Sequence, residues 1–309
     1  MPKLFEAEGA NLDRGYVNIK AGAHRIEREL REMLEAMWAS YAPYADPDFR
    51  EGFARDVDAR FWEMYLGCAL LGAGHALLPV VERRREGGQP DLCVLDGDRR
   101  IWIEAIAPDD GKPGPDQIVR PVPLNEGGGV IAAPVRQAQL RTTSALWTKA
   151  QKIRRYLDEG VIGANDVRLI AISASRFGVF VPDEPVPLIM SSVFPIGDLV
   201  VTIDTETGDV VDQRYDHAPH IEREGGRIPR TAFLDPLFAH VSGVIWSRLV
   251  IGNHDRTRRP LTLVHNPLAE VPMPQRWGVW DREFVTALDG DRWTACDILD
   301  SSSAEDAAA

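Results

Sequence analysis

The first third of the chain alternates between helical and strand-like patterns of apolar residues. Residues 21–41 carry apolar side chains at the spacing of one helix face, opposite a charged face: Ile26, Leu30, Met33, Leu34, Met37 and Trp38. A second helix is predicted over 49–73, ending at Gly72 or Gly74. Strands are predicted in HALLPVVER, DLCVLDG and IWIEAIA, the last two joined by a tight turn near Gly97-Asp98. This order predicts an α/β beginning.

The pattern changes twice in the rest of the chain. Residues 108–134 are rich in Pro and Gly and too long for an ordinary connection, which is typical of a functional cover or an unstructured segment. A helix is predicted over 136–158, followed by a central strand, VRLIAIS (167–173), whose nearly continuous apolar run indicates cover on both faces. After Ser175, short strands and turns follow, including a hairpin around Thr207-Gly208 and strands in GVIWSRLVI and LTLVHNP.

These patterns predict three parts. Residues 1–50 form an N-terminal helical arm, 51–175 an α/β core and 176–309 a β-rich C-terminal extension, packed with the core as one unit. With 309 residues, of which 44% are hydrophobic, the chain can bury a substantial core.

Composition bears on location and on metal binding. The apolar stretch 64–81 is broken by Gly72, Gly74 and Pro79 and flanked by charges, so it predicts a buried helix and strand rather than a membrane span. The start shows no apolar run of a secretory signal, and we expect a cytoplasmic protein without membrane contact. Three widely separated cysteines, Cys68, Cys93 and Cys296, are expected to be buried free thiols and imply no zinc site.

The net charge of -12 argues against coating nucleic acid by bulk electrostatics. The charge is uneven, however, because residues 136–157 contain six basic and no acidic residues. Only five of the 35 basic residues in the chain are lysines, and two of them lie in this helix. Any nucleic-acid contact is therefore predicted to be confined to this helix and sensitive to salt.

Three acids are candidates for chemistry. Glu63 lies on the second helix, Asp91 follows Pro90 at the start of a strand, and Glu104 lies inside the apolar strand IWIEAIA. A buried carboxylate is costly unless it is paired or binds a metal. The hairpin turn near Gly97 sets Asp91 opposite Glu104. Two such carboxylates with a backbone carbonyl make an oxygen-only site that suits Mg²⁺ or Mn²⁺.

This order of residues resembles the PD-(D/E)xK, or restriction-endonuclease-like, nuclease superfamily over roughly residues 51–175. The resemblance rests on the helix Glu in RFWEMYLG, Pro90-Asp91, Glu104 in IWIEAIA and the basic helix after them. It implies a central mixed sheet flanked by helices. It also implies that Asp91 and Glu104 ligate the metal, with the carbonyl of Ala105 as third ligand and Glu63 as a helix acid that binds metal or water.

The sequence departs from the family pattern at one position. The family's lysine, two residues after the strand Glu, is Ile106 here. Some members take the lysine from the following helix, where this chain has Lys149 and Lys152. Helical spacing puts Lys149 at the border of the apolar stripe, so it is predicted to reach inward, while Lys152 or Arg141 would meet a substrate phosphate.

The resulting hypothesis is a Mg²⁺-dependent nuclease that hydrolyses DNA, rather than RNA, with a metal-activated water. The alternative is a catalytically inactive nuclease-like protein that binds nucleic acid or a protein partner. The oligomeric state stays open, a homodimer included. GNHD (252–255) and GDVVD (208–212) match metallophosphoesterase motifs, but the further histidine motifs of those enzymes are missing. His217 and His220 are expected in a loop.

Overall fold

The computed structural model describes residues 2–83, 88–119, 132–178, 185–253, 260–289 and 292–300. Its helices are α1 (Arg14–Ala21), α2 (Arg25–Tyr41), α3 (Phe49–Arg55), α4 (Val57–Gly72), α5 (Val80–Arg83), α6 (Val135–Asp158) and α7 (Met190–Val193). Its strands are β1 (Ala76–Leu77), β2 (Leu92–Asp96), β3 (Arg99–Ile106), β4 (Val167–Ser173), β5 (Ile196–Ile203), β6 (Val210–His217), β7 (His220–Arg223), β8 (Gly226–Pro229), β9 (Gly243–Ser247), β10 (Thr262–His265), β11 (Arg282–Asp289) and β12 (Arg292–Asp297).

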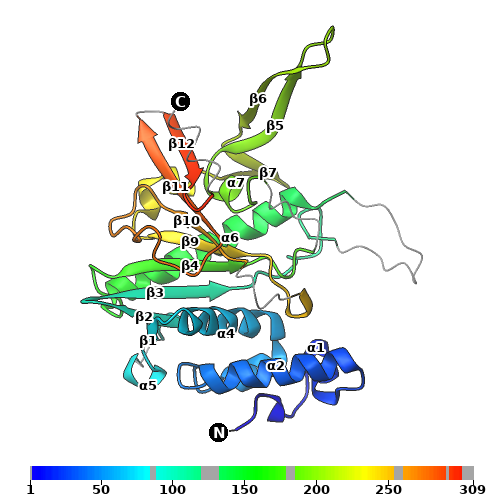
Figure 1. Ribbon diagram of the computed structural model, residues 1–309, viewed down its shortest axis with the longest axis vertical. Helices are drawn as coiled ribbons and strands as arrows, with labels where there is room; N and C mark the ends of the chain where they lie inside the picture. Colours follow the sequence, from blue (N-terminus) through cyan, green and yellow to red (C-terminus); the bar gives the residue numbers. More distant parts are fainter. Residues whose placement is uncertain are drawn as a thin grey trace.

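A mixed sheet of eight strands forms the centre, in the order β1-β2-β3-β4-β9-β10-β11-β12 (Figure 1). The β2–β3 hairpin is antiparallel, whereas β3, β4 and β9 run parallel. The parallel step from β3 to β4 is made through α6, as parallel neighbours require a crossover. The predicted α/β class, a mixed sheet flanked by helices, is therefore confirmed.

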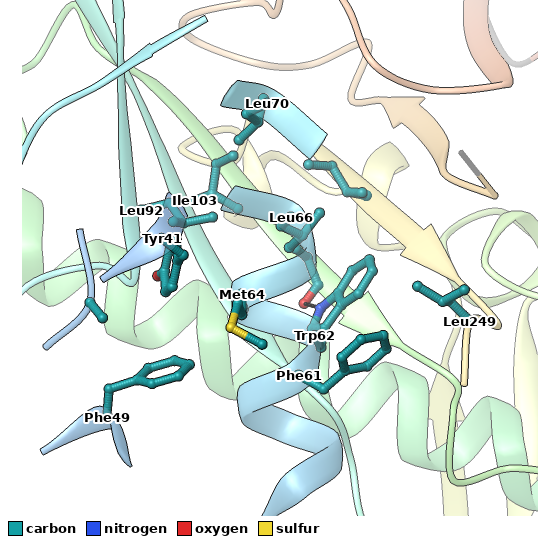
Figure 2. Close-up of a cluster of buried hydrophobic side chains, with 14 of the residues drawn as sticks. Tyr41, Phe49, Phe61, Trp62, Met64, Leu66, Leu70, Leu92, Ile103 and Leu249 are labelled. Atoms are coloured by element: carbon teal, nitrogen blue, oxygen red, sulfur yellow. Dashed lines mark hydrogen bonds between the residues drawn. The ribbon is translucent and has the colours of Figure 1, made fainter. Parts of the chain in front are cut away.

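Alternating side chains of the central strands build two cores, one on each face of the sheet. On one face Ile103 and Leu169 pack with α4, whose Trp62 also donates a hydrogen bond to the carbonyl of Ala171 at 3.1 Å (Figure 2). On the other face Trp102 and Ile170 pack against α6. β3 therefore presents its residues alternately to α4 and to α6, and this decides where its one acid points.

The predicted single helix over 49–73 is wrong, because the chain breaks it at Asp56. Asp56 has non-helical backbone angles and its carboxylate accepts the N–H of Ala59 at 3.0 Å, so it caps the N-terminus of α4. The strand predicted in HALLPVVER is confirmed only for Ala76 and Leu77. After Pro79 the chain turns into α5, since proline fixes a backbone angle that suits the first turn of a helix.

The C-terminal part contributes to the same sheet as the core. Strands β9 to β12 continue it beyond β4, and β11 and β12 have no counterpart among the predicted strands. The hairpin predicted around Thr207-Gly208 is confirmed as β5–β6, which projects away from the sheet (Figure 1). The strand predicted in GVIWSRLVI ends already at Ser247. His254, Asp255 and residues 301–309 lie outside the described residues.

Two further predictions concern composition. Within the described part of the chain, no helix is long and apolar enough to cross a membrane. All three cysteines are free, and the expected burial is confirmed for Cys93 but wrong for Cys296, which is exposed because β12 is the last strand of the sheet. Cys68 is half-buried.

The contact between α2 and α4 yields a test of the packing. A Cβ at Gly67 would overlap the buried ring of Tyr41. We expect Gly67→Ala to lower the free energy of unfolding by about 1–3 kcal/mol, although alanine is the better helix former. Gly72→Ala in the same helix, where nothing lies within 4 Å, should be neutral or stabilising by up to about 1 kcal/mol. Urea unfolding of both variants measures the difference, and equal effects would contradict the close approach.

Candidate active site

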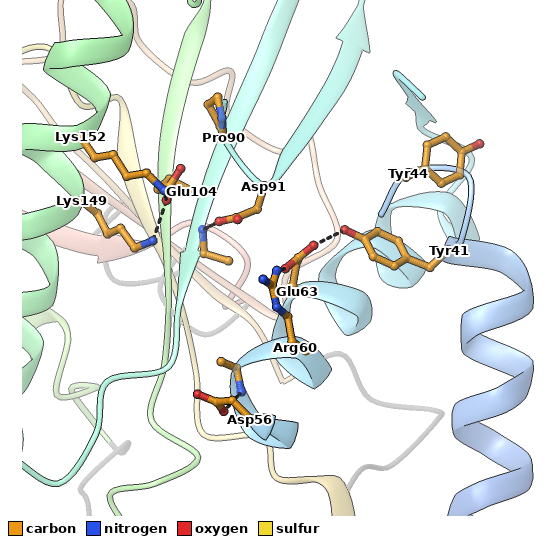
Figure 3. Close-up of polar contacts among 12 residues, drawn as sticks. Tyr41, Tyr44, Asp56, Arg60, Glu63, Pro90, Asp91, Glu104, Lys149 and Lys152 are labelled. Atoms are coloured by element: carbon orange, nitrogen blue, oxygen red, sulfur yellow. Dashed lines mark hydrogen bonds and ion pairs between the residues drawn. The ribbon is translucent and has the colours of Figure 1, made fainter. Parts of the chain in front are cut away.

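Glu104 is the buried centre of the site. The alternation along β3 turns its side chain, which is 1% exposed, toward α6. There Lys149 and Lys152 each donate from Nζ to Glu104 Oε1 at 2.6 Å (Figure 3). Since a buried charge without a partner is strongly destabilising, these two ammonium groups explain how an acid persists in an apolar strand.

The inward position of Lys149 agrees with the sequence prediction, but that of Lys152 does not. Lys152 was expected to face a substrate phosphate, and it reaches the same carboxylate oxygen instead. One helical turn separates the two residues, so both can converge on one point of the sheet. The Lys152 side chain remains 34% exposed, against 14% for Lys149, so Lys152 lies at the solvent side of the pair.

Asp91 immediately precedes the neighbouring strand β2, in the position opposite Glu104. The β2–β3 ladder pairs Leu92 with Ile103, and one further step sets Asp91 opposite Glu104, in agreement with the predicted register. Asp91 Oδ2 accepts the backbone N–H of Ala105 at 2.6 Å. The N–H and C=O of one strand residue point to the same edge, so the carbonyl of Ala105 also faces the side of Asp91.

Arg83 fixes the backbone in front of Asp91, a role that the sequence analysis missed. Its guanidinium donates to the carbonyl oxygen of Pro90 at 2.6 Å and to the carbonyl oxygen of Tyr44. Its exposed fraction is only 4%. Residues 83–85 are all arginines, and such a run gives no signal that one of them is buried.

Glu63 approaches Asp91 from the α4 side of the sheet. Its Oε1 accepts the hydroxyl of Tyr41 at 2.8 Å, and its Oε2 accepts Arg60 Nη1 at 2.7 Å. Asp91 lies between Glu63 and Glu104 in Figure 3. Burial raises the pKa of Glu63 to about 8, and the charge of Asp91 adds to this, while Arg60 and Tyr41 act in the opposite direction.

Burial and neighbouring charges also shift the pKa values of Glu104 and Lys152 on the α6 side. Burial and then the charge of Asp91 raise the pKa of Glu104 above its ordinary value, against the effect of the two lysines. Burial lowers the pKa of Lys152, but the charge of Glu104 and the hydrogen bond to it outweigh burial, so the pKa is raised. Lys152 is therefore firmly protonated at neutral pH.

The oxygen atoms around Glu104 and Asp91 supply some, but not all, of the ligands that a divalent cation needs. Glu104 Oε2 is buried and has no hydrogen-bond partner among the described residues, so it offers a lone pair to a cation or a water. Asp91 and the carbonyl of Ala105 add oxygen donors of the kind that Mg²⁺ prefers. Within the described ranges, however, no three His, Cys, Asp or Glu side chains are placed to hold one ion. Glu63 is instead bound to Tyr41 and Arg60, and its role as a ligand stays a prediction.

The remaining predicted residues lie apart from this cluster or at its edge. Arg141 lies eight residues before Lys149 on α6, about 12 Å along the axis, and binds Asp109 through Nη2 at 2.5 Å. Ile106 is half-buried on the face of Glu104, where Lys149 supplies the ammonium from α6. His217 and His220 were expected in a loop but lie at the exposed ends of β6 and β7.

In comparisons with known proteins, the chain matches no family model, no curated protein and no solved structure. The functional argument therefore depends on the residues around Glu104 and on the order of the elements that carry them.

The raised pKa of Glu63 gives a prediction about pH. The folded state favours the protonated carboxyl, so this contribution to stability is fully present below the unfolded pKa near 4.5 and is lost as pH rises through about 8. Between pH 5 and 8.5 we expect the wild type to lose on the order of 3 kcal/mol more free energy of unfolding than Glu63→Gln. Urea unfolding across this range measures it. Parallel pH profiles for the two proteins would contradict the assignment.

Proposed function

We propose that the protein is a metal-dependent phosphodiesterase that hydrolyses DNA, with a restriction-endonuclease-like core. The observation that carries the proposal is the ion pair of Lys149 with Glu104, on the strand position opposite Asp91. In the nuclease superfamily that the sequence resembles, the lysine two residues after the strand Glu lies on the face of that Glu. Here Ile106 takes that position, and Lys149 brings an ammonium to the same face from the helix above.

The order of elements supports the same proposal. A helix with an acid (α4) precedes an antiparallel hairpin (β2–β3), and a basic helix (α6) then leads to β4, which is parallel to β3. Asp91 immediately precedes β2 and Glu104 lies near the end of β3, so the two acids meet at the end of the hairpin away from its turn. This is the arrangement that the resemblance implies for the core.

The residues have distinct roles in the proposed reaction. Asp91, Glu104 and the carbonyl of Ala105 would hold the metal, which when bound lowers the pKa of a water and offsets charge on the phosphate. The N–H of Ala105 and the Arg83–Pro90 contact fix the orientation of Asp91. Lys149 places a positive charge beside the reacting phosphate, where it stabilises the charge that develops in the transition state.

The alternative, a nuclease-like protein that binds nucleic acid or a protein without cutting, also has support. Lys149 and Lys152 already neutralise Glu104, and the described residues hold no cluster of three metal-ligating side chains. In that case the basic helix α6 would bind phosphates while the carboxylates only position its lysines. Metal-dependent turnover separates the two functions.

Cleavage of a labelled DNA oligonucleotide with Mg²⁺ or Mn²⁺ tests the proposal. We expect Asp91→Asn and Glu104→Gln to abolish turnover, because each removes a carboxylate from the metal site. Lys149→Ala should lower kcat about 100-fold or more while metal binding stays nearly intact, because the ammonium acts on the transition state. Calorimetric titration with Mn²⁺ measures the binding.

A matched lysine variant and a folding control complete this test. Lys112→Ala, which changes an exposed lysine away from Glu104, should keep wild-type turnover. Because Glu104→Gln leaves two ammonium groups without a counter-charge, its thermal unfolding must be compared with the wild type. Full activity in both the Asp91 and Glu104 variants, with a folded protein, would refute the site.

A further inference from the structure

A cavity of about 440 Å³ opens directly beside the proposed site. Asp91 and Lys152 of the proposed site line it, and so does the segment between α2 and α3 that includes Asp46 and Asp48. Its volume lies toward the small end of the range for small-ligand pockets, roughly 300–1,000 Å³. A double helix is too large to enter such a space, whereas one nucleotide that has left the stack is not.

The α6 wall of the cavity is suited to a phosphate. Lys152 and Arg155 both line it, and their charged groups lie 5.6 and 5.3 Å from the centre of the buried Tyr156 ring. The ring holds the two cations at one side of the cavity through cation–π contacts. Arg60 of α4 adds a third cation, so a phosphate here would lie next to Asp91.

The other walls are suited to a hydrogen-bond donor. Gln89 lines the cavity, and its Oε1 atom is buried without a partner among the described residues, so a rotation of this side chain toward the cavity would let the oxygen accept a hydrogen bond. The backbone carbonyl of Gln89 accepts the Tyr156 hydroxyl at 3.0 Å, so the residue is fixed against α6. The carboxylates of Asp46 and Asp48 repel a second phosphate but accept bonds from amino or hydroxyl groups.

We propose that this cavity takes the nucleoside next to the scissile phosphate as an unpaired unit, and that the substrate is single-stranded nucleic acid. The inference rests on the proposed nuclease function. In a duplex each base is stacked and its pairing edge is occupied, so reaching Gln89 would require flipping it out at a cost of a few kcal/mol. A single strand reaches the cavity without this cost, and the exocyclic amino groups of its bases supply donors for Gln89.

Cleavage of one oligonucleotide in two states tests the strand preference. The 5′-labelled strand is used alone and annealed to its complement as a blunt duplex, with Mg²⁺ or Mn²⁺ present. We expect kcat/KM to be at least about tenfold higher for the single strand, because the duplex pays for unpairing. Equal rates on both forms would overturn the inference while leaving the nuclease function intact.

Variants of the cavity test where the preference arises. Asp48→Trp places an indole in the cavity from an exposed position whose side chain makes no capping bond, and Gln89→Leu removes the unpaired acceptor. Both should lower kcat/KM for the single strand at least about tenfold relative to bis(p-nitrophenyl) phosphate, which has a phosphodiester but no nucleoside. Glu51→Trp, the matched change on the exposed surface of α3, should keep the wild-type ratio. An unchanged ratio in both cavity variants would refute the site.

Binding separates this inference from the proposed chemistry. If neither DNA nor bis(p-nitrophenyl) phosphate is hydrolysed with any divalent metal, the nuclease function fails. Fluorescence anisotropy with the same labelled strand then decides the inference alone. Tighter binding of the single strand than of the duplex, weakened by Asp48→Trp but not by Glu51→Trp, supports it. Equal binding of both forms, or none, refutes it.

Discussion

The buried carboxylate of Glu104 is the constraint on which the arrangement of this protein depends. An ionised acid that is 1% exposed inside an apolar strand is strongly destabilising unless opposite charges reach it. Both charges come from α6, 45 and 48 residues further along the chain. α6 must therefore lie across β3 with one particular face inward. That placement in turn fixes the crossover that brings β4 parallel to β3.

Asp91 lies between the acids on the two faces of the sheet. On the α4 side Glu63 is held by Tyr41 and Arg60, and on the α6 side Glu104 is held by its two lysines, with Asp91 between them (Figure 3). After burial, the charge of Asp91 is the next cause that raises the pKa of both glutamates, so one residue acts on the acids of both faces. The three acids therefore form a row from one face of the sheet to the other, with Arg60 beside Glu63 and the two lysines beside Glu104.

The elements with a strong local pattern were predictable, and those defined by distant contacts were not. The helix 136–158 buries one face, which leaves a helical repeat in the sequence. The hairpin with its turn near Gly97 and the strand 167–173 are buried on both faces over much of their length, which leaves short apolar runs. The break at Asp56 depends on a cap rather than on a period. It is reinforced by Arg176, which binds Asp56 and Asp58 at the start of α4 from a position more than 100 residues away. Strands β11 and β12 were not predicted. They are the last two strands of the sheet and depend on pairing with β10, which lies earlier in the chain.

The sequence by itself determined which acids and which helix belong to the candidate site. A charged residue in an apolar strand and lysines in a chain with few of them are visible without coordinates, and the turn length sets Asp91 against Glu104. Only the tertiary structure decided that Lys152 and Lys149 donate to the same oxygen of Glu104. It also decided that Arg83 is buried and donates to the carbonyl of Pro90, and that Arg141 binds Asp109. These outcomes depend on how far and at what angle α6 crosses the sheet. The spacing of residues along the chain indicates the face of the helix on which a side chain lies, but it does not determine the distance from that side chain to a partner on another element.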